Sequence, residues 1–315
     1  MGGNVTTVLK PDVKSDTNPT SDAKPEFKAA VGLSRKWEAR EAGREVAADT
    51  LSKLGHGVKP DFFLLFTTIH YEKHGGFKEF LAGVWDVLPK DTPLIGGTVA
   101  GFINPQGCYT RGATALAVNY PNMDIAVGIG KDTRRNPEKA AKELSTGLRE
   151  SFDNSRYSRN LLFTLLPGGT IPSFFGIGRK KVLKNSALAK LSLSLLDLSI
   201  KFMQMGPGRE EEVFESLAEH LSSGYIIGGS TTDDLHQSSC YQFYGNSVYS
   251  THVVGLNIKS NLKVDILTSY GLKGTGKTLS ITKKGLRDCV ILEFDHKPAT
   301  GEFLKQLKWP KDFLD

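Results

Sequence analysis

Leu94-Ile95-Gly96-Gly97-Thr98 is repeated further along the chain as Ile226-Ile227-Gly228-Gly229-Ser230. Gly97 and Gly229 are 132 positions apart, and the pairs Cys108-Tyr109 and Cys240-Tyr241 have the same spacing, so the two stretches align without a gap. In both, an amphipathic pattern and an apolar run precede the glycine doublet. The repetition predicts two copies of one α/β unit.

In the first copy, short apolar runs alternate with helical periodicity, which is typical of an α/β protein. The clearest helix has apolar residues spaced so that they fall on one face: Phe77, Phe80, Leu81, Val84, Trp85 and Leu88. Another helix is expected after Ser34, which can cap it. Strands are expected at residues 28–33, 62–68, 92–99, 113–120 and 123–129.

The same order returns in the second copy. Asn136-Pro137 predicts a helix start, because proline suits the first helical position. Three glutamates, residues 210–212, favour the N-terminal end of a second helix. The strands of this copy are expected at residues 161–166, 225–230, 241–244, 248–249 and 253–258.

We therefore expect an α/β fold of two repeated halves with mixed sheets, residues 28–130 and 131–260. The glycine-doublet strand ends of the halves are expected to face a common cleft. Residues 1–27 are rich in Lys, Asp, Thr, Ser and Pro and predict a disordered tail. Residues 167–208 are expected to be an insertion in the second half, and residues 261–315 a β-rich C-terminal segment.

Composition narrows the class of protein. The 315 residues carry a formal net charge of +6 and are 39% hydrophobic, which indicates a chain that mostly folds. Three scattered cysteines do not make a disulfide framework or a thiolate metal site, so we expect a reducing, cytoplasmic setting and no cofactor. No basic helix is interleaved with aromatic residues and prolines break the long uncharged runs, so neither nucleic acid nor membrane is expected as a partner.

One string suggests an enzyme. Residues 271–278, GLKGTGKT, satisfy the phosphate-loop pattern, in which Lys277 and Thr278 would contact nucleotide phosphates. Such a loop must lead into a helix, whereas the residues after Thr278 alternate as a strand does. An NTPase is therefore kept as an alternative function.

The insertion offers a second alternative. Residues 187–205 combine six leucines with flanking lysines, a pattern that can form a helix lying on a membrane surface. The same pattern also fits a helix docked on the protein. A membrane-surface scaffold is thus the other alternative function.

The glycine doublets are the candidate ligand site, because a strand that ends in glycine lets the backbone approach a ligand closely. The candidate ligand-binding residues are Gly96, Gly97, Thr98, Gly228, Gly229, Ser230, Thr231, Asp233 and Asp234. Adjacent carboxylates at Asp233 and Asp234 would bind a cationic group such as an amine. The same two residues equally fit a turn in which an aspartate bonds nearby N–H groups.

The string from Ile227 to Asp234, followed by aromatic residues before the turn Gly245-Asn246, resembles the N-terminal sensory region of the FIST family (F-box and intracellular signal transduction proteins). The string 95–101 is similar to the earlier glycine turn of that family. Residues 271–306, with Asp295-His296-Lys297-Pro298-Ala299, resemble the start of its C-terminal domain. The resemblance implies a sensor of small ligands, such as amino acids, that has no catalytic activity and acts through a separate output partner.

Overall fold

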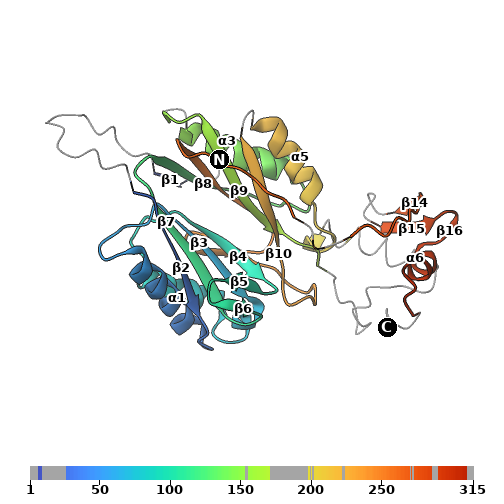
Figure 1. The fold of residues 1–315 in the computed structure, drawn as a ribbon, viewed down its shortest axis with the longest axis horizontal. Coiled ribbons are helices and arrows are strands. Elements are labelled where there is room, and N and C mark those ends of the chain that lie inside the picture. Colours follow the sequence, from blue (N-terminus) through green and yellow to red (C-terminus); the bar gives the residue numbers. More distant parts are fainter. Residues whose placement is uncertain are drawn as a thin grey trace. The chain divides into compact units, whose positions relative to one another are not determined.

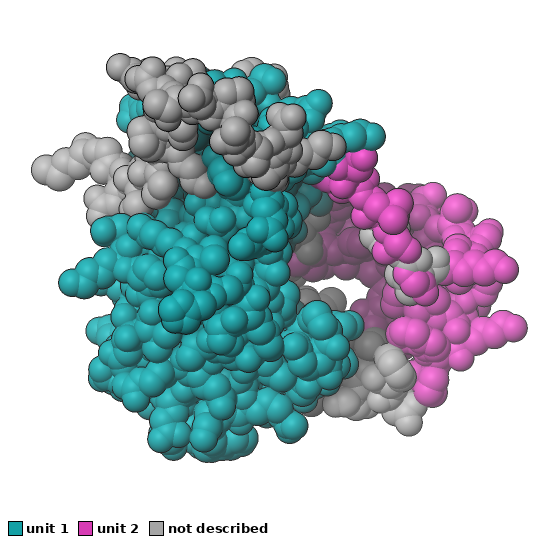
Figure 2. Space-filling view, turned by 60° about the vertical axis from the view of Figure 1, so that its left-hand side comes forward, with its two compact units in different colours: residues 1–170, 208–264 teal, residues 171–207, 265–315 magenta. Residues whose placement is uncertain are grey.

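The computed structural model describes residues 6–8, 26–152, 155–170, 198, 200, 202–221, 224–269, 271, 273–285 and 290–310. They belong to two compact units, residues 1–170 with 208–264 and residues 171–207 with 265–315, which are coloured separately in Figure 2. Most of the expected insertion and of the 187–205 segment lies outside the described residues, as does Cys289.

The first unit contains a six-stranded mixed sheet with the strand order β12-β11-β4-β3-β7-β2. Its strands are β2 (Lys28–Ser34), β3 (Phe62–Thr68), β4 (Leu94–Val99), β7 (Ala113–Asn119), β11 (Gln242–Tyr244) and β12 (Ser247–Tyr249). Helices α1 (Ala39–Leu54) and α2 (Gly76–Trp85) cover one face of this sheet, and the short helix η1 (Ile69–Glu72) follows β3.

A second, five-stranded sheet has the order β1-β8-β13-β9-β10. Its strands are β1 (Thr6–Val8), β8 (Met123–Gly130), β9 (Arg159–Pro167), β10 (Tyr225–Thr231) and β13 (Val253–Ser260). Helices α3 (Pro137–Phe152) and α5 (Glu210–His220) cover its outer face, as Figure 1 shows.

The first unit has four layers, helix, sheet, sheet and helix. Phe63 and Leu65 of β3 pack under α1 and α2, whereas their neighbour Phe62 faces the second sheet. Val127 and Leu256 of the second sheet belong to the same inter-sheet cluster. The strands of both sheets lie between a helix layer and the other sheet, so they are buried on both faces. They therefore appear in the sequence as continuous apolar runs.

The strand order confirms the expected α/β class and reveals the repeat. Strands β4-β3-β7-β2 of the first sheet correspond to β10-β9-β13-β8 of the second, in the same order. The corresponding pairs β3–β4 and β9–β10 are both parallel. Gly96 and Gly228 also match, because a Cβ on either would lie 1.9 Å from a carbonyl oxygen of the neighbouring strand.

The gapless alignment, however, is wrong beyond the glycine doublets. The hairpin of β5 (Phe102–Asn104) and β6 (Gly107–Tyr109) has the same element pattern as β11 and β12, and the spacing between the two hairpins is 140 residues. The second half therefore has eight additional residues between β10 and its hairpin. Cys108 lies in β6 and Cys240 lies before β11, so the two cysteines are not equivalent.

Two boundaries also differ from the expectation. Strand β8, which the sequence analysis assigned to the first half at 28–130, pairs with β13 in the second sheet, because the chain crosses between the sheets at Pro121-Asn122. Within the expected disordered tail, Thr6–Val8 forms β1 and pairs with β8. Ser34 does not cap α1, which begins at Ala39; its hydroxyl instead donates to Glu45 of that helix.

The described part of the second unit contains the strands β14 (Ile281–Gly285), β15 (Val290–Phe294) and β16 (Lys297–Pro298) and the helix α6 (Ala299–Leu307). Strand β14, not a helix, follows the phosphate-loop string. The amine of Lys277 donates to the carbonyl of Gln306. The string thus lacks the helix N-terminus on which phosphate binding by such a loop depends.

Candidate functional site

The two glycine-doublet strands meet at their C-terminal ends. A Cβ on Gly97 of β4 would lie 2.4 Å from Cγ2 of Thr231 in β10, so only glycine permits this approach. The amide of Thr98 donates to the carbonyl of Tyr241, and the carbonyl of Thr98 accepts from the amide of Thr232. The expected meeting of the two halves at these residues is therefore present, but as a direct contact.

Buried side chains complete this junction. The Gln242 amide group donates to Oγ1 of Thr231 at 2.6 Å, and its oxygen accepts from the amide of His252. Thr98 Oγ1 accepts from the amide of Tyr241 at 3.0 Å. Thr98 and Thr231 are 0% and 1% exposed. At these residues the strand ends contact each other directly, because their polar groups bond to one another.

Beside the junction lies the buried guanidinium of Arg134. It donates to the carbonyl of Gly168 and lies 3.5 Å from Sγ of Cys240. The hydroxyl of Ser230 donates to the carboxylate of Glu210 at the start of α5. The Ser230 contact holds the end of β10 against the start of α5, and the amide of Gly168, the residue bound by Arg134, donates to the carbonyl of Thr231.

Asp233 organises the eight additional residues after β10. Its carboxylate accepts from the amides of Gln237, Ser238 and Ser239 and from the Ser238 hydroxyl. Burial raises the pKa of this carboxyl, but these hydrogen bonds outweigh burial and lower it overall. Leu235 and Gln237 adopt left-handed backbone angles, with φ of 73° and 53°, so the loop carries strain that Asp233 offsets.

The predicted site residues therefore separate into two groups. Asp233 forms the self-capped turn that was one of its two expected roles, because its buried carboxylate is bonded within the loop. Asp234 is more exposed; it forms an ion pair at 3.7 Å with Arg111 and lies 3.7 Å from Nε2 of His236. At Gly229 an added Cβ would meet no atom within 4 Å. Ligand binding by Asp234 and Gly229 stays a prediction.

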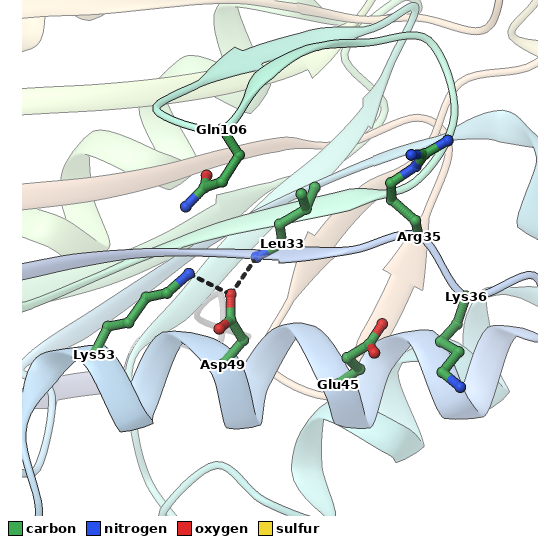
Figure 3. A pocket seen from close by; sticks show the side chains of 7 residues that line it. All are labelled: Leu33, Arg35, Lys36, Glu45, Asp49, Lys53 and Gln106. Carbon is green, nitrogen blue, oxygen red and sulfur yellow. Dashed lines mark hydrogen bonds and ion pairs between the residues drawn. The ribbon is translucent and has the colours of Figure 1, made fainter.

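An open cavity of about 490 Å³ lies elsewhere in the first unit, between α1, the end of β2 and the β5–β6 turn. Figure 3 shows the side chains that line it, which are Leu33, Arg35, Lys36, Glu45, Asp49, Lys53 and Gln106. We call this cavity the α1 pocket. It belongs entirely to the first half, away from the junction of the strand ends.

The α1 pocket combines both signs of charge. The Asp49 carboxylate accepts from the amide of Leu33 at 2.9 Å and from the amine of Lys53 at 2.6 Å. Glu45 accepts from Ser34, so both acids are held in place by the end of β2. The Arg35 guanidinium lies 5.6 Å from the ring centre of Tyr109 in the hairpin, which is within cation–π range.

These residues were not among the predicted site residues. A signal was present, since Glu45, Asp49 and Lys53 recur every four positions and form one charged stripe along α1. Such a stripe is normally a solvated helix face. What distinguishes it here is the hairpin turn carrying Gln106, which overhangs the stripe and was not predicted (Figure 3).

Among the described residues, no group of three or more His, Cys, Asp or Glu side chains is placed to hold a metal ion. In that same part of the chain, none of the helices has the length and apolar character needed to cross a membrane.

Comparison with known proteins identifies the family. Residues 61–297 match the model of the FIST N domain. Over 129 residues the chain is 28% identical to an uncharacterized protein of Methanocaldococcus jannaschii; the match covers 40% of this chain and 25% of that relative. The chain thus spans about a quarter of the curated relative that it matches.

Two solved structures of cyanuric acid hydrolase, one of them from A. caulinodans, are similar at 10% identity. The first has a TM-score of 0.34 and covers 78% of this chain and 73% of the hydrolase. The second has a TM-score of 0.33, with 80% and 72% covered. The family match covers most of the chain, from β3 to β16, and the chain belongs to the FIST N domain family.

Proposed function

We propose that this chain is a sensory module that binds a small charged metabolite in the α1 pocket and acts through a separate protein partner, without catalysis. Membership of the FIST N domain family supports the sensory role. The observation that carries the choice of site is the pocket itself, whose volume of about 490 Å³ is in the range of small-molecule sites.

The charges of the pocket favour a ligand that carries both signs. Lys53 already neutralises Asp49, and Glu45 is oriented by Ser34. Arg35 and Lys36 add two cations to the lining, which suit a carboxylate. A free amino acid fits this arrangement, with its carboxylate toward Arg35 and its ammonium group toward Glu45.

The hairpin gives the pocket a route to a partner. Gln106, at the β5–β6 turn, lines the pocket, and its backbone N–H donates to the side-chain oxygen of Asn104. A ligand that bonds to Gln106 would stabilise one position of the turn. The outer face of the same hairpin is exposed, so a partner protein that contacts it would distinguish the ligand-bound position of the turn from other positions.

The first experiment is mass spectrometry of small molecules released from the purified, denatured protein. It is followed by calorimetric titration of the stripped protein with the free amino acids. Arg35→Gln and Glu45→Gln should each weaken binding about tenfold or more, the scale of a lost charge-assisted hydrogen bond. Lys78→Gln, which alters an exposed residue of α2 outside the pocket, is the matched control and should leave binding unchanged.

Two results would contradict the proposal. One is ligand binding that neither pocket variant weakens, which would place the site elsewhere. The other is nucleotide hydrolysis that is lost in Lys277→Ala, which would restore the enzyme alternative.

A further inference from the structure

The two hairpins of the repeat have different surroundings. Strand β11 of the second half pairs antiparallel with β4, the strand that carries the first glycine doublet. In the repeat, β5 of the first half corresponds to β11, and β10 of the second half corresponds to β4. A symmetric structure would therefore pair β5 with β10. Yet β5 pairs only with β6, and β10 is an edge strand whose outer side is bonded to no other strand of the described chain.

The free hairpin exposes the residues that its counterpart buries. In β11, Phe243 is 0% exposed, pairs across the hairpin with Val248 and packs on Phe77 of α2. The equivalent residue in β5 is Ile103, which is 83% exposed and pairs with Cys108. An isoleucine at the centre of a hairpin is therefore left in solvent.

The edge of β10 is exposed as well. Tyr225 at its start is 46% exposed, and Gly228 in its centre is also exposed. Natural proteins cover or disrupt edges of this kind, because unpaired N–H and C=O groups readily accept another strand. The described chain thus contains a donor hairpin and an acceptor edge that are not joined to each other.

The lengths of the segments before the two hairpins explain why β5 does not pair with β10 within one chain. Ten residues, 232–241, separate β10 from β11 and let that hairpin cross to the other sheet. Only Ala100 and Gly101 separate β4 from β5, a reach of about 7 Å. Asn104 donates to Thr114 at the start of β7, which holds the hairpin on its own half.

We propose that the β5–β6 hairpin of one molecule pairs with the β10 edge of a second copy of this chain. The register follows from the pairing of β11 with β4, in which Phe243 is opposite Gly96 and Gln242 is opposite Gly97. Ile103 then lies opposite Gly228, and Phe102 opposite Gly229. Each copy offers one hairpin and one edge, so the exchange closes as a two-fold dimer.

The first test is the mass in solution, measured by sedimentation equilibrium over a range of concentrations. The full chain should associate to twice 34.4 kDa, and Ile103→Asp should shift the equilibrium to the monomer. Leu267→Asp is the matched control, because Leu267 is 93% exposed and lies outside both surfaces. A monomeric wild-type chain, or a dimer that Ile103→Asp leaves intact, would overturn the proposal.

The second test fixes the register. Phe102→Cys and Gly229→Cys are combined in a Cys108→Ser, Cys289→Ser background, and Gly229 has open space for the new side chain. Mild oxidation should give a disulfide-linked dimer on a non-reducing gel. A disulfide within one chain, or none, would reject pairing between copies. Asn104→Cys with Gly229→Cys is the off-register control and should give no linked dimer.

Discussion

Gly97 of the first half and Thr231 of the second are in contact, and a Cβ on Gly97 would lie 2.4 Å from the Thr231 methyl group and 2.7 Å from the carbonyl of Tyr241. One of these neighbours is backbone, so it cannot rotate away. We expect Gly97→Ala to lower the free energy of unfolding by about 1–3 kcal/mol, the usual cost of overpacking. Urea-induced unfolding followed by tryptophan fluorescence measures it.

The repeat supplies the control for this experiment. Gly229 occupies the position in β10 that Gly97 has in β4, but an added Cβ there would meet no atom within 4 Å. Gly229→Ala should therefore leave stability unchanged or raise it by up to about 1 kcal/mol, because alanine restricts the unfolded chain. Equal losses in the two variants would contradict the close contact at Gly97.

Asp233 gives a prediction about the loop after β10. Asp233→Asn replaces an acceptor of four hydrogen bonds with an amide that has one acceptor oxygen. We expect the ligand-free protein to lose about 1–3 kcal/mol of stability, the cost of leaving buried donors without a partner. Thermal unfolding without added ligand measures it.

The neighbouring carboxylate is the control. Asp234 forms an ion pair at 3.7 Å with Arg111 at the surface, where such pairs contribute about 0–1 kcal/mol. Asp234→Asn should therefore change the unfolding temperature much less. If Asp233→Asn left the unfolding temperature of the ligand-free protein unchanged, the hydrogen bonds of Asp233 would not be what stabilises this loop.

The sequence predicted most of the elements of the first unit, because its strands are buried on both faces and its helices have a clear apolar side. Phe62–Thr68 has the predicted bounds of β3, and Phe77, Phe80, Leu81 and Val84 are all buried in α2. It did not predict the β5–β6 hairpin. Phe102–Asn104 is only three residues long and half exposed, so it has no periodicity to detect.

The candidate site was harder to predict than the fold. The glycine doublets indicated that backbones approach closely at the strand ends, which is correct for Gly97. The sequence could not show that the approaching group is Thr231 of the other half and not a ligand. Contacts of this kind depend on how the two sheets pack, and the eight additional residues after β10 concealed the true alignment of the hairpins.

His70 predicts a pH dependence of stability. It is 8% exposed, its Nδ1 lies 2.8 Å from the Thr68 hydroxyl, and burial, with the charges of Arg111 and His74, lowers its pKa to about 4. The unfolded chain takes up this proton near pH 6.5. The stability from a neutral His70 is therefore complete above about pH 6.5 and is lost as the pH falls to about 4, by at most about 3 kcal/mol.

The measurement is the unfolding free energy at several values of pH between 7 and 4 for the wild type and for His70→Gln. The variant should show a smaller loss, and the difference between the two curves isolates His70 from other groups, such as His252, whose pKa burial also lowers. His56→Gln, an exposed histidine, should follow the wild type. Parallel curves for His70→Gln and the wild type would contradict the prediction.

The two described cysteines should react very differently, because one is exposed and the other is buried. Cys108 lies on the exposed face of the β5–β6 hairpin, whereas Cys240 is 3% exposed beside Arg134. In the Ile103→Asp variant, whose hairpin is not covered by a second copy, we expect iodoacetamide to modify Cys108 readily in the folded chain and Cys240 only after unfolding, because a buried thiol reacts through the open state. Peptide mapping by mass spectrometry separates the two sites. Comparable labelling of both cysteines in the folded chain would contradict the burial of Cys240 beside the junction of the strand ends.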